Sequence, residues 1–231
     1  MGVLTYPSLV VILAALNEEQ GIGPSLAELR LVLEKPRCLV VDGKSVDRTI
    51  EVAKEMGAEV LLQEGIGKGE AISQAIRYIN SDAVDYVVLT DADYTYPIEC
   101  VPEMIRILEQ NPEVGMVVGN RFNSHLHLGA MKNYFYLGNR VIAFTNNLLN
   151  GINLRDPLTG LRVIRWKIIK NWQPKSSGFD IEVELNHHVE RQGYDIREIE
   201  IAYRKRIGEK KLKLRHGVTI LKRILTESIL K

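Results

Sequence analysis

Five short apolar runs alternate with helical patterns through the first half of the chain, and this alternation constrains the fold more than any other feature. The apolar runs are Ser8–Ala15, Arg37–Val41, Glu59–Leu62, Tyr86–Thr90 and Val114–Val118. The helical patterns between them cover Ser25–Glu34, Val46–Met56, Lys68–Ile79 and Ile98–Gln110. A continuous apolar run is typical of a strand buried on both faces. Regular alternation of such strands with helices predicts an α/β fold, with a mostly parallel sheet flanked by helices.

The pattern changes after Gly119. The second half shows a long helical pattern with one charge, a strand, a helix, a last strand and an amphipathic helix: Tyr134–Leu149, Leu158–Ile164, Ile181–Gln192, Ile196–Tyr203 and His216–Leu230. A chain of 231 residues is long enough for one domain of this class. We predict a single domain over residues 1–215, with residues 216–231 as an amphipathic helical extension of it.

Charge and cysteine content exclude several classes of protein. Thirty basic residues against 29 acidic ones give a net charge of +1, so we expect no nucleic-acid partner. The two cysteines have no zinc or disulfide spacing. We recognise no signal peptide after Met1 and no apolar stretch near the roughly 20 residues that span a bilayer. We therefore expect a cytoplasmic protein whose contact with a membrane, where it has one, is peripheral.

Polar, glycine-rich or acidic segments follow four of the predicted strands. They are Leu16–Glu19, Asp42–Thr49, Gly65–Ala71 and Asp91–Asp93. Each segment by itself is also explained by turn chemistry. Ligands of parallel α/β sheets bind beyond the carboxyl ends of the strands, and there the four segments would meet. Together they predict a ligand site at this edge of the sheet.

Asp91 and Asp93 lie one residue apart at the end of a buried strand. Two such carboxylates repel each other, and burial disfavours their charged forms. A divalent cation relieves both problems, and Mg²⁺ often binds one or two carboxylates together with substrate phosphates. The pair therefore indicates a metal that holds a diphosphate. A turn aspartate followed by a helix N-cap is the alternative interpretation.

In order and spacing, these motifs resemble the inverting family-2 glycosyltransferases of the GT-A fold. The resemblance is strongest to the dolichyl- or polyprenyl-phosphate hexosyltransferases, which include dolichol-phosphate mannose synthases. It extends from Val10 to about Leu225, and further matching segments are Gly119–Arg121, Asp156–Arg162 and Phe179–Glu182. It implies metal-dependent transfer of a hexosyl unit, with inversion, from a nucleotide-diphosphate sugar of the GDP-mannose or UDP-glucose type to dolichyl or polyprenyl phosphate. The implied cofactor is Mg²⁺ or Mn²⁺.

The resemblance also implies roles for individual residues. The nucleotide-sugar site would be lined by Leu16, Asn17, Glu18, Asp42, Lys68, Asp91, Ala92 and Asp93, with Asp42 accepting hydrogen bonds from the nucleobase. The metal ligands would be Asp91 and Asp93, with Thr95 as a candidate third ligand where relatives often carry Gln. The catalytic set would be Asp93, Arg121 and Asp156, and the acceptor phosphate would be bound by Arg121, Arg204 and Arg206. The chain has Gly43 where the family usually has a second Asp.

Several residues also have a purely structural interpretation. Asp47 is explained as a helix cap, and Arg121 as a surface salt bridge. Asp180 and Glu182 open a helix, where an acidic residue stabilises the dipole. Arg140, Arg162 and Lys211 are further candidates for a cationic cradle, and His187 and His188 are interpreted as structural.

Alternatives to this function remain. One is a glycosyltransferase with a soluble hydroxyl acceptor, and another is a non-catalytic protein that binds a nucleotide sugar. A sugar nucleotidyltransferase would carry a glycine-rich loop after the first strand, where this chain has Ala15–Glu19. The C-terminal amphipathic helix is a candidate for a membrane surface, and docking on the domain or on a second subunit is open.

Overall fold

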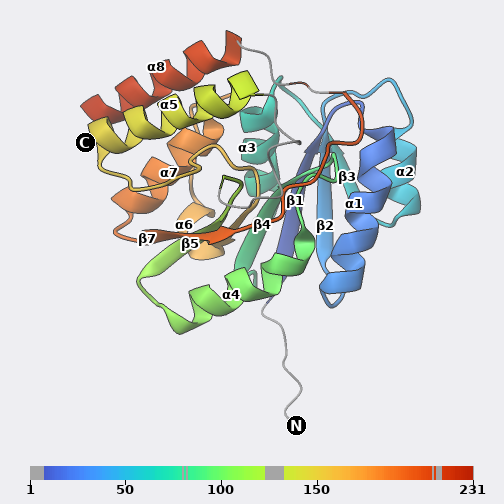
Figure 1. The fold of residues 1–231 in the computed structure, drawn as a ribbon. Coiled ribbons are helices and arrows are strands. Elements are labelled where there is room, and N and C mark those ends of the chain that lie inside the picture. The colour runs from blue at the N-terminus through green and yellow to red at the C-terminus, as the bar shows by residue number, and fades with distance from the viewer. Residues whose placement is uncertain are drawn as a thin grey trace.

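The computed structural model describes residues 8–79, 81, 83–122, 133–209, 211 and 215–230. A seven-stranded sheet runs through the molecule, with strands in the order β3-β2-β1-β4-β6-β5-β7 (Figure 1). The strands are β1 (Leu9–Ala15), β2 (Arg37–Asp42), β3 (Glu59–Leu62), β4 (Tyr86–Asp91), β5 (Val114–Asn120), β6 (Arg162–Arg165) and β7 (Asp195–Glu200). Only β6 is antiparallel to its neighbours among these strands. The predicted mostly parallel α/β sheet is therefore confirmed.

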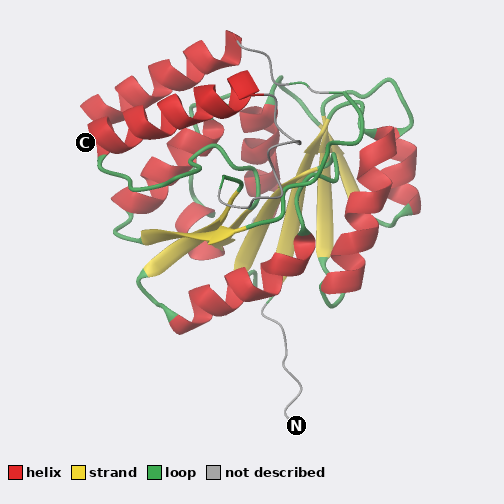
Figure 2. Cartoon of the chain, viewed as in Figure 1, coloured by secondary structure: helices red, strands yellow, loops and turns green. Residues whose placement is uncertain are grey.

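Helices cover both faces of the sheet (Figure 2). They are α1 (Glu19–Val32), α2 (Thr49–Glu55), α3 (Lys68–Ile79), η1 (Ile98–Cys100), α4 (Val101–Gln110), α5 (Asn133–Asn150), α6 (Trp166–Ile169), α7 (Ile181–Arg191) and α8 (Arg215–Ile229). Side chains of α1, α2 and α4 form one apolar core with the sheet. Side chains of α3, α6 and α7 form the other core on the opposite face. Successive residues of a buried strand point to opposite faces, which explains the continuous apolar runs of β1 and β4.

Helices α5 and α8 lie side by side and form an outer layer over α7 (Figure 1). Ile142 of α5 and Ile220 and Ile224 of α8 are buried together with Val183 of α7. Arg223 of α8 joins this contact with ion pairs to Glu184 of α7 and to Asp180 at the N-terminal flank of that helix. Helix α8 thus packs on the domain by one face. No helix among the described residues is long and apolar enough to cross a bilayer.

Three predicted element starts were wrong. Helix α1 begins at Glu19, well before Ser25, and continues through Pro24. The carbonyl of Glu18 accepts the N–H groups of Gly21 and Ile22, and Ile22 is fully buried, so tertiary packing outweighs the proline signal. Helix α2 begins at Thr49 because residues 43–48 form a loop, and β6 begins at Arg162 because residues 156–161 form another.

Candidate active site

A cavity of about 700 Å³ opens at the carboxyl ends of β1, β2 and β4. Of the predicted site residues, Leu16, Glu18, Lys68, Asp91, Ala92, Asp93, Arg121 and Arg206 line it. Asn17, Asp42, Thr95, Asp156 and Arg204 do not line it. The four polar strand ends therefore meet as predicted, but five of the predicted residues have a different place.

Lys68 neutralises the first carboxylate of the pair. Its Nζ atom lies 2.7 Å from Oδ1 of Asp91 and 2.8 Å from Oε1 of Glu182. Burial opposes the charge on Lys68, but these two carboxylates outweigh it and raise its pKa. Burial likewise works to raise the pKa of Asp91, and Lys68 reverses this and lowers it. Gly160 borders the same carboxylate, since a Cβ there would lie 3.0 Å from both oxygens.

Arg206 and Thr95 hold the second carboxylate. Nη1 of Arg206 lies 2.5 Å from Oδ2 of Asp93, and its Nη2 donates to Oε1 of Glu18. The hydroxyl of Thr95 donates to Oδ1 of Asp93 at 2.5 Å, and its backbone N–H donates to the same oxygen at 3.1 Å. Burial and the neighbouring Asp91 raise the pKa of Asp93 against the influence of Arg206. Thr95 is fully buried, and its two hydrogen bonds orient the carboxylate of Asp93.

Glu18 is a further buried carboxylate beside this pair. Its side chain is 6% exposed, and its Oε2 atom is buried with no hydrogen-bond partner among the described residues. Burial raises its pKa to about 7, although Arg206 and Lys211 oppose this shift. Arg206 thus lies between two carboxylates that converge on the cavity.

The donor set fits a divalent cation that shares its coordination with a ligand. No group of three or more His, Cys, Asp or Glu side chains in the described part of the chain is arranged as an all-protein metal cage. Mg²⁺ and Mn²⁺ do not need such a cage, because one or two carboxylates, water and phosphate oxygens suffice. Asp91 and Asp93 would supply the carboxylates, and Thr95 would act through Asp93.

Arg121 is held in place by a residue behind the cavity wall. Its Nε and Nη2 atoms donate to Oδ2 and Oδ1 of Asp156 at 2.6 and 2.8 Å. Asp156 is fully buried, and Glu198 fixes its loop by accepting the backbone N–H of Asp156 at 2.8 Å. The guanidinium also stacks on the ring of Tyr203, 5.3 Å from its centroid. The carboxylate of Asp156 outweighs burial and raises the pKa of Arg121, so the cation is permanent.

Three of the predicted residues have structural contacts away from the cavity. Arg204 donates to both carboxylate oxygens of Glu28 and also to Glu99, so its charge is already paired. The oxygens of Asp42 accept the backbone N–H and the hydroxyl of Ser45 at 2.7 and 2.6 Å, and Asp42 is fully buried. Asn17 has a backbone φ of +50° and its Oδ1 accepts the N–H of Val46.

Other interpretations from the sequence now have definite contacts. The N-cap of α2 is Arg48 and not Asp47, but Asp47 accepts the backbone N–H of Thr49 at 3.0 Å and so holds the helix start from one residue earlier. Arg162 is 1% exposed and donates to the carbonyls of Thr159 and Pro157, so it braces the loop of Asp156 and does not reach the cavity. Lys211 lines the cavity and donates to the carbonyl of Asn17 at 3.1 Å.

Sequence reasoning missed several cavity residues. The sequence explains Glu182 by the helix dipole, but in the structure it pairs with Lys68, and its Oε2 has no hydrogen-bond partner among the described residues. Gln63, Tyr96 and Tyr203 also line the cavity. The position of Glu182 in the Phe179–Glu182 motif was the available signal. Gln63 and the two tyrosines follow from no local pattern, because distant segments bring them to the cavity.

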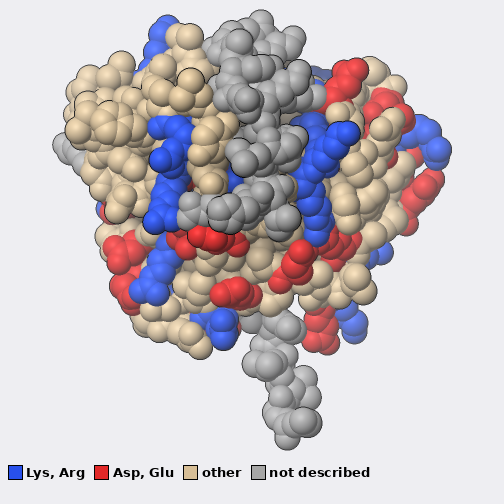
Figure 3. All heavy atoms as spheres, in the orientation of Figure 1, with Lys and Arg blue, Asp and Glu red and all other residues tan. Residues whose placement is uncertain are grey.

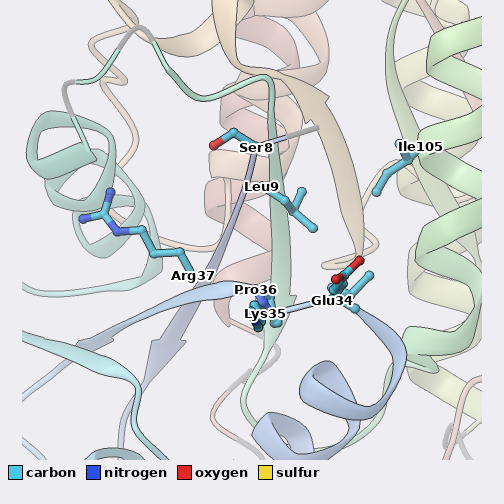
Figure 4. A pocket seen from close by; sticks show the side chains of 8 residues that line it. Ser8, Leu9, Glu34, Lys35, Pro36, Arg37 and Ile105 are labelled. Carbon is cyan, nitrogen blue, oxygen red and sulfur yellow. The ribbon is translucent and has the colours of Figure 1, made fainter. Parts of the chain in front are cut away.

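A second hollow, of about 250 Å³, lies at the opposite edge of the sheet beside the starts of β1 and β2 (Figure 4). Ser8, Leu9, Glu34, Lys35 and Arg37 line it. Arg37 is paired there with Glu59 at 2.7 Å. This hollow therefore lacks the converging carboxylates and cations of the larger cavity, which we take as the candidate active site.

Comparisons with known proteins agree on one family. The model of the family described as "Glycosyl transferase family 2" matches residues 10–172. The chain is 34% identical over 210 residues to the dolichyl-phosphate hexose transferase of Haloferax volcanii, covering 90% of this chain and 88% of that protein. It is 29% identical to the low-salt glycan biosynthesis hexosyltransferase Agl6 of the same organism, covering 89% of this chain and 50% of that protein.

Solved structures show a similar fold. The crystal structure of glucosyl-3-phosphoglycerate synthase from Mycobacterium tuberculosis with uridine diphosphate superposes with a TM-score of 0.75 at 21% identity, covering 96% of this chain and 80% of that chain. The complex of the same enzyme with Mn²⁺, UDP-glucose and phosphoglyceric acid gives a TM-score of 0.74 at 20% identity, with the same coverage.

Proposed function

Because the chain belongs to glycosyl transferase family 2 and is a hexosyltransferase of the GT-A fold, we propose that it transfers a hexosyl unit from a nucleotide-diphosphate sugar to a prenyl phosphate such as dolichyl phosphate, with a divalent metal. The observation that carries the proposal is the set of three cations around the aspartate pair, Lys68, Arg121 and Arg206. Two polyanions must meet in this reaction, and such a site needs more positive charge than a transferase with a neutral acceptor. The name of the Haloferax volcanii relative supports this acceptor.

We assign the leaving diphosphate to the space beside Asp91 and Asp93. When bound there, Mg²⁺ or Mn²⁺ would neutralise charge that develops on the leaving diphosphate. Arg206 would exchange its carboxylate partners for phosphate oxygens, and Lys68 would keep Asp91 in its charged form. Charged donors held in place before the reaction stabilise the transition state without reorganising.

We assign the acceptor phosphate to Arg121. Nε and Nη2 of Arg121 are occupied by Asp156, so Nη1 is the atom that would donate to a phosphate oxygen. A phosphate monoester is largely dianionic at neutral pH and needs little help from a base. Its oxygen would bond to the anomeric carbon while the bond from that carbon to the diphosphate oxygen breaks. The displacement is in line and inverts the anomeric centre. Asp156 would act as a positioning residue for Arg121.

We propose that the lipid chain and the membrane contact the exposed face of α5 and α8. This α5–α8 face consists of Leu137, Val141, Phe144, Leu148, Val218, Leu221, Leu225 and Ile229, each at least 37% exposed. Figure 3 shows this part of the surface, at the upper left, as largely free of charged side chains. Apolar side chains at helical spacing with basic ones beside them, here Arg140 and Lys222, are typical of an interfacial helix.

The same two helices connect this face with the cavity. Asn139 of α5 and His216 of α8 line the cavity, whereas Phe144 and Leu225 point outward. A lipid that lies along the α5–α8 face would therefore bring its phosphate to the cavity mouth. We propose that the protein works peripherally on the cytoplasmic face of a membrane, where nucleotide sugars are available.

A panel of nucleotide sugars tests the proposal. UDP-glucose, GDP-mannose and related donors are incubated with a short-chain prenyl phosphate and Mg²⁺ or Mn²⁺, and the glycolipid is measured. We expect one donor to give product, with inverted anomeric configuration, and no product after chelation of the metal. Asp93→Asn should abolish turnover while circular dichroism stays unchanged. Transfer to soluble hydroxyl acceptors with none to prenyl phosphate would refute the assigned acceptor.

A further inference from the structure

The end of the cavity over β2 and β3 differs chemically from the end that holds the aspartate pair. Its lining is Gly43, Lys44, Gln63, Gly65, Ile66 and Gly67. Lys44 is the one charged side chain among these residues. Strand β4 lies two strands from β2, or about 10 Å. A ligand whose diphosphate lies beside Asp91 and Asp93 would therefore place its nucleoside over this nearly neutral end.

Asp42 is not available to read a nucleobase there. Both of its oxygens already accept hydrogen bonds from Ser45, and its side chain is fully buried. The next residue is Gly43, which has no side chain to replace it. A hydrogen-bond acceptor for the ring N–H of a nucleobase must therefore come from another element.

Gln63 presents such an acceptor. Its Nε2 atom donates to the carbonyl of Gly67 at 2.8 Å. Only the nitrogen of an amide can donate to a carbonyl, so Oε1 is directed the other way. Among the described residues, no donor forms a hydrogen bond with Oε1, and Gln63 lines the cavity.

The orientation of this amide is fixed before any ligand binds. The backbone N–H of Gln63 donates to the carbonyl of Asp42 at 2.8 Å. Gly67 has a φ of +101°, and a Cβ there would lie 2.4 Å from the carbonyl oxygen of Ser177. The carbonyl that holds Nε2 is therefore itself fixed by close packing, and Oε1 needs no reorganisation.

Gly43 and Gln63 fit each other. A Cβ at position 43 would lie 3.3 Å from Oε1 of Gln63 and 3.4 Å from the carbonyl oxygen of Ala15. The side chain of an aspartate at position 43 would begin between these two acceptors, and its carboxylate would have no proton to share with either. Because position 43 has no side chain, Oε1 of Gln63 has room to act as a hydrogen-bond acceptor.

We propose that Oε1 of Gln63 reads the nucleobase of the sugar donor by accepting its ring N–H, and that Gly43 leaves the room for this contact. The inference rests on the proposed use of a nucleotide sugar. Uracil carries such a group at N3 and guanine at N1, whereas adenine and cytosine have no ring N–H on this edge. Gln63 would therefore select uracil or guanine and reject the other two bases.

Binding of nucleotides to the full chain tests this with Mg²⁺ present. Calorimetry compares UDP with N3-methyl-UDP and GDP with N1-methyl-GDP, so that the two arms distinguish the bases. We expect one unmethylated nucleotide to bind at least about tenfold more tightly than its methylated form, as one well-placed hydrogen bond allows. In Gln63→Ala this ratio should fall to about one, while inorganic pyrophosphate binds as in the wild type.

The matched control is Gln74→Ala. Gln74 holds the chain at the end of β3, next to Gln63, since its Nε2 donates to the carbonyl of Leu62 at 2.9 Å, but it does not line the cavity. This variant should keep the methylation ratio. A ratio that persists in Gln63→Ala, or a wild type without one, would overturn the inference. Hexosyl transfer by that same wild type would leave the proposed function standing. A Gln63-dependent ratio without transfer to prenyl phosphate would instead refute only the proposed acceptor.

A double variant tests the relation between the two positions. Gly43→Asp alone should weaken nucleotide binding, because its carboxylate faces Oε1 of Gln63. Gly43→Asp combined with Gln63→Ala should regain the methylation ratio, because the acceptor then comes from position 43. Failure to regain it, with normal pyrophosphate binding, would overturn the role assigned to Gly43.

Discussion

The side chain of Arg121 donates two hydrogen bonds to Asp156, at 2.6 and 2.8 Å, and only the arginine of this pair lines the cavity. The carboxylate fixes the plane of the guanidinium and leaves Nη1 as the nitrogen that does not pair with Asp156. Two residues separated by 35 positions in sequence therefore act as one unit.

We expect Asp156→Asn to reduce both stability and turnover. Removal of one partner from a buried ion pair costs about 3–5 kcal/mol, because the other charge is left unpaired. Turnover should fall about 100-fold, as for loss of a preorganised donor. Chemical denaturation and steady-state kinetics measure the two effects. Arg121→Lys combined with Asp156→Asn should be no slower than the slower single variant, because the residues act together.

The matched control for that experiment is Arg165→Lys. Arg165 donates to the carbonyl of Val114 at 2.8 Å and lies at the end of β6 remote from the cavity. This variant should lose stability but keep its turnover number. Full activity in folded Asp156→Asn would contradict the positioning role.

Arg206 occupies the space between Glu18 and Asp93, so it competes with a divalent cation in the free protein. We expect Arg206→Gln to bind Mn²⁺ at least about tenfold more tightly without nucleotide, because two carboxylates lose their internal counter-charge. Transfer should nevertheless fall, because the leaving diphosphate loses a donor. Titration calorimetry with Mn²⁺ alone checks the first effect.

Arg204→Gln is the control two residues away. Its guanidinium is paired with Glu28 and Glu99 and does not line the cavity. Mn²⁺ affinity and turnover should stay near wild type. Weaker Mn²⁺ binding in Arg206→Gln would show that the arginine supports the metal site and does not compete with it.

Glu18 should make stability depend on pH. Its pKa is about 7 in the folded protein against 4.5 as the ordinary value. Between these values the native state binds more protons than the unfolded state, so the free energy of unfolding decreases as pH rises, by roughly 3 kcal/mol at most. The decrease is complete above pH 7 and absent below 4.5.

Glu18→Gln should lack this contribution, because glutamine does not titrate. Urea unfolding with a chelator, from pH 5 to 8, measures the difference in free energy of unfolding between the two proteins. That difference should shift in favour of the variant as pH rises. A constant difference across the range would refute the raised pKa of Glu18.

The α5–α8 face should bind anionic vesicles. We expect the double variant Phe144→Glu and Leu225→Glu to lose at least about tenfold in vesicle affinity, because two charges enter an apolar surface. Co-sedimentation with vesicles of phosphatidylcholine and phosphatidylserine measures it. Activity on a short-chain, water-soluble acceptor should persist, because neither residue lines the cavity.

Leu31→Glu is the matched control, since Leu31 is 87% exposed on α1 and remote from α8. It should bind vesicles as the wild type does. If the wild-type protein does not bind vesicles but forms a dimer, and the double variant is a monomer, the face would be assigned to self-association.

Much of the fold follows from local patterns. The apolar runs that became β1, β2, β4 and β5 are buried on both faces, and a short-range pattern is enough to recognise such strands. Element starts were less predictable. The helical pattern Ser25–Glu34 predicted a helix start at Ser25, but the buried side chain of Ile22 and the Glu18 carbonyl set an earlier one. The start of α1 is decided by its contacts with β1 and with the loop after β4. These segments lie outside any short stretch of sequence around the helix start.

The sequence by itself determined the α/β class with a mostly parallel sheet, the edge of the sheet that carries the site and the kinds of side chain gathered there. Only the tertiary structure decided which of those side chains face the cavity. Arg204 and Arg206 look equivalent in sequence, yet one is paired with Glu28 and the other with Asp93 and Glu18. The pairing of Arg206 with Glu18 spans 188 residues. Such pairings depend on how whole helices and loops pack and on which charges burial leaves unpaired, and neither quantity is encoded in a local pattern.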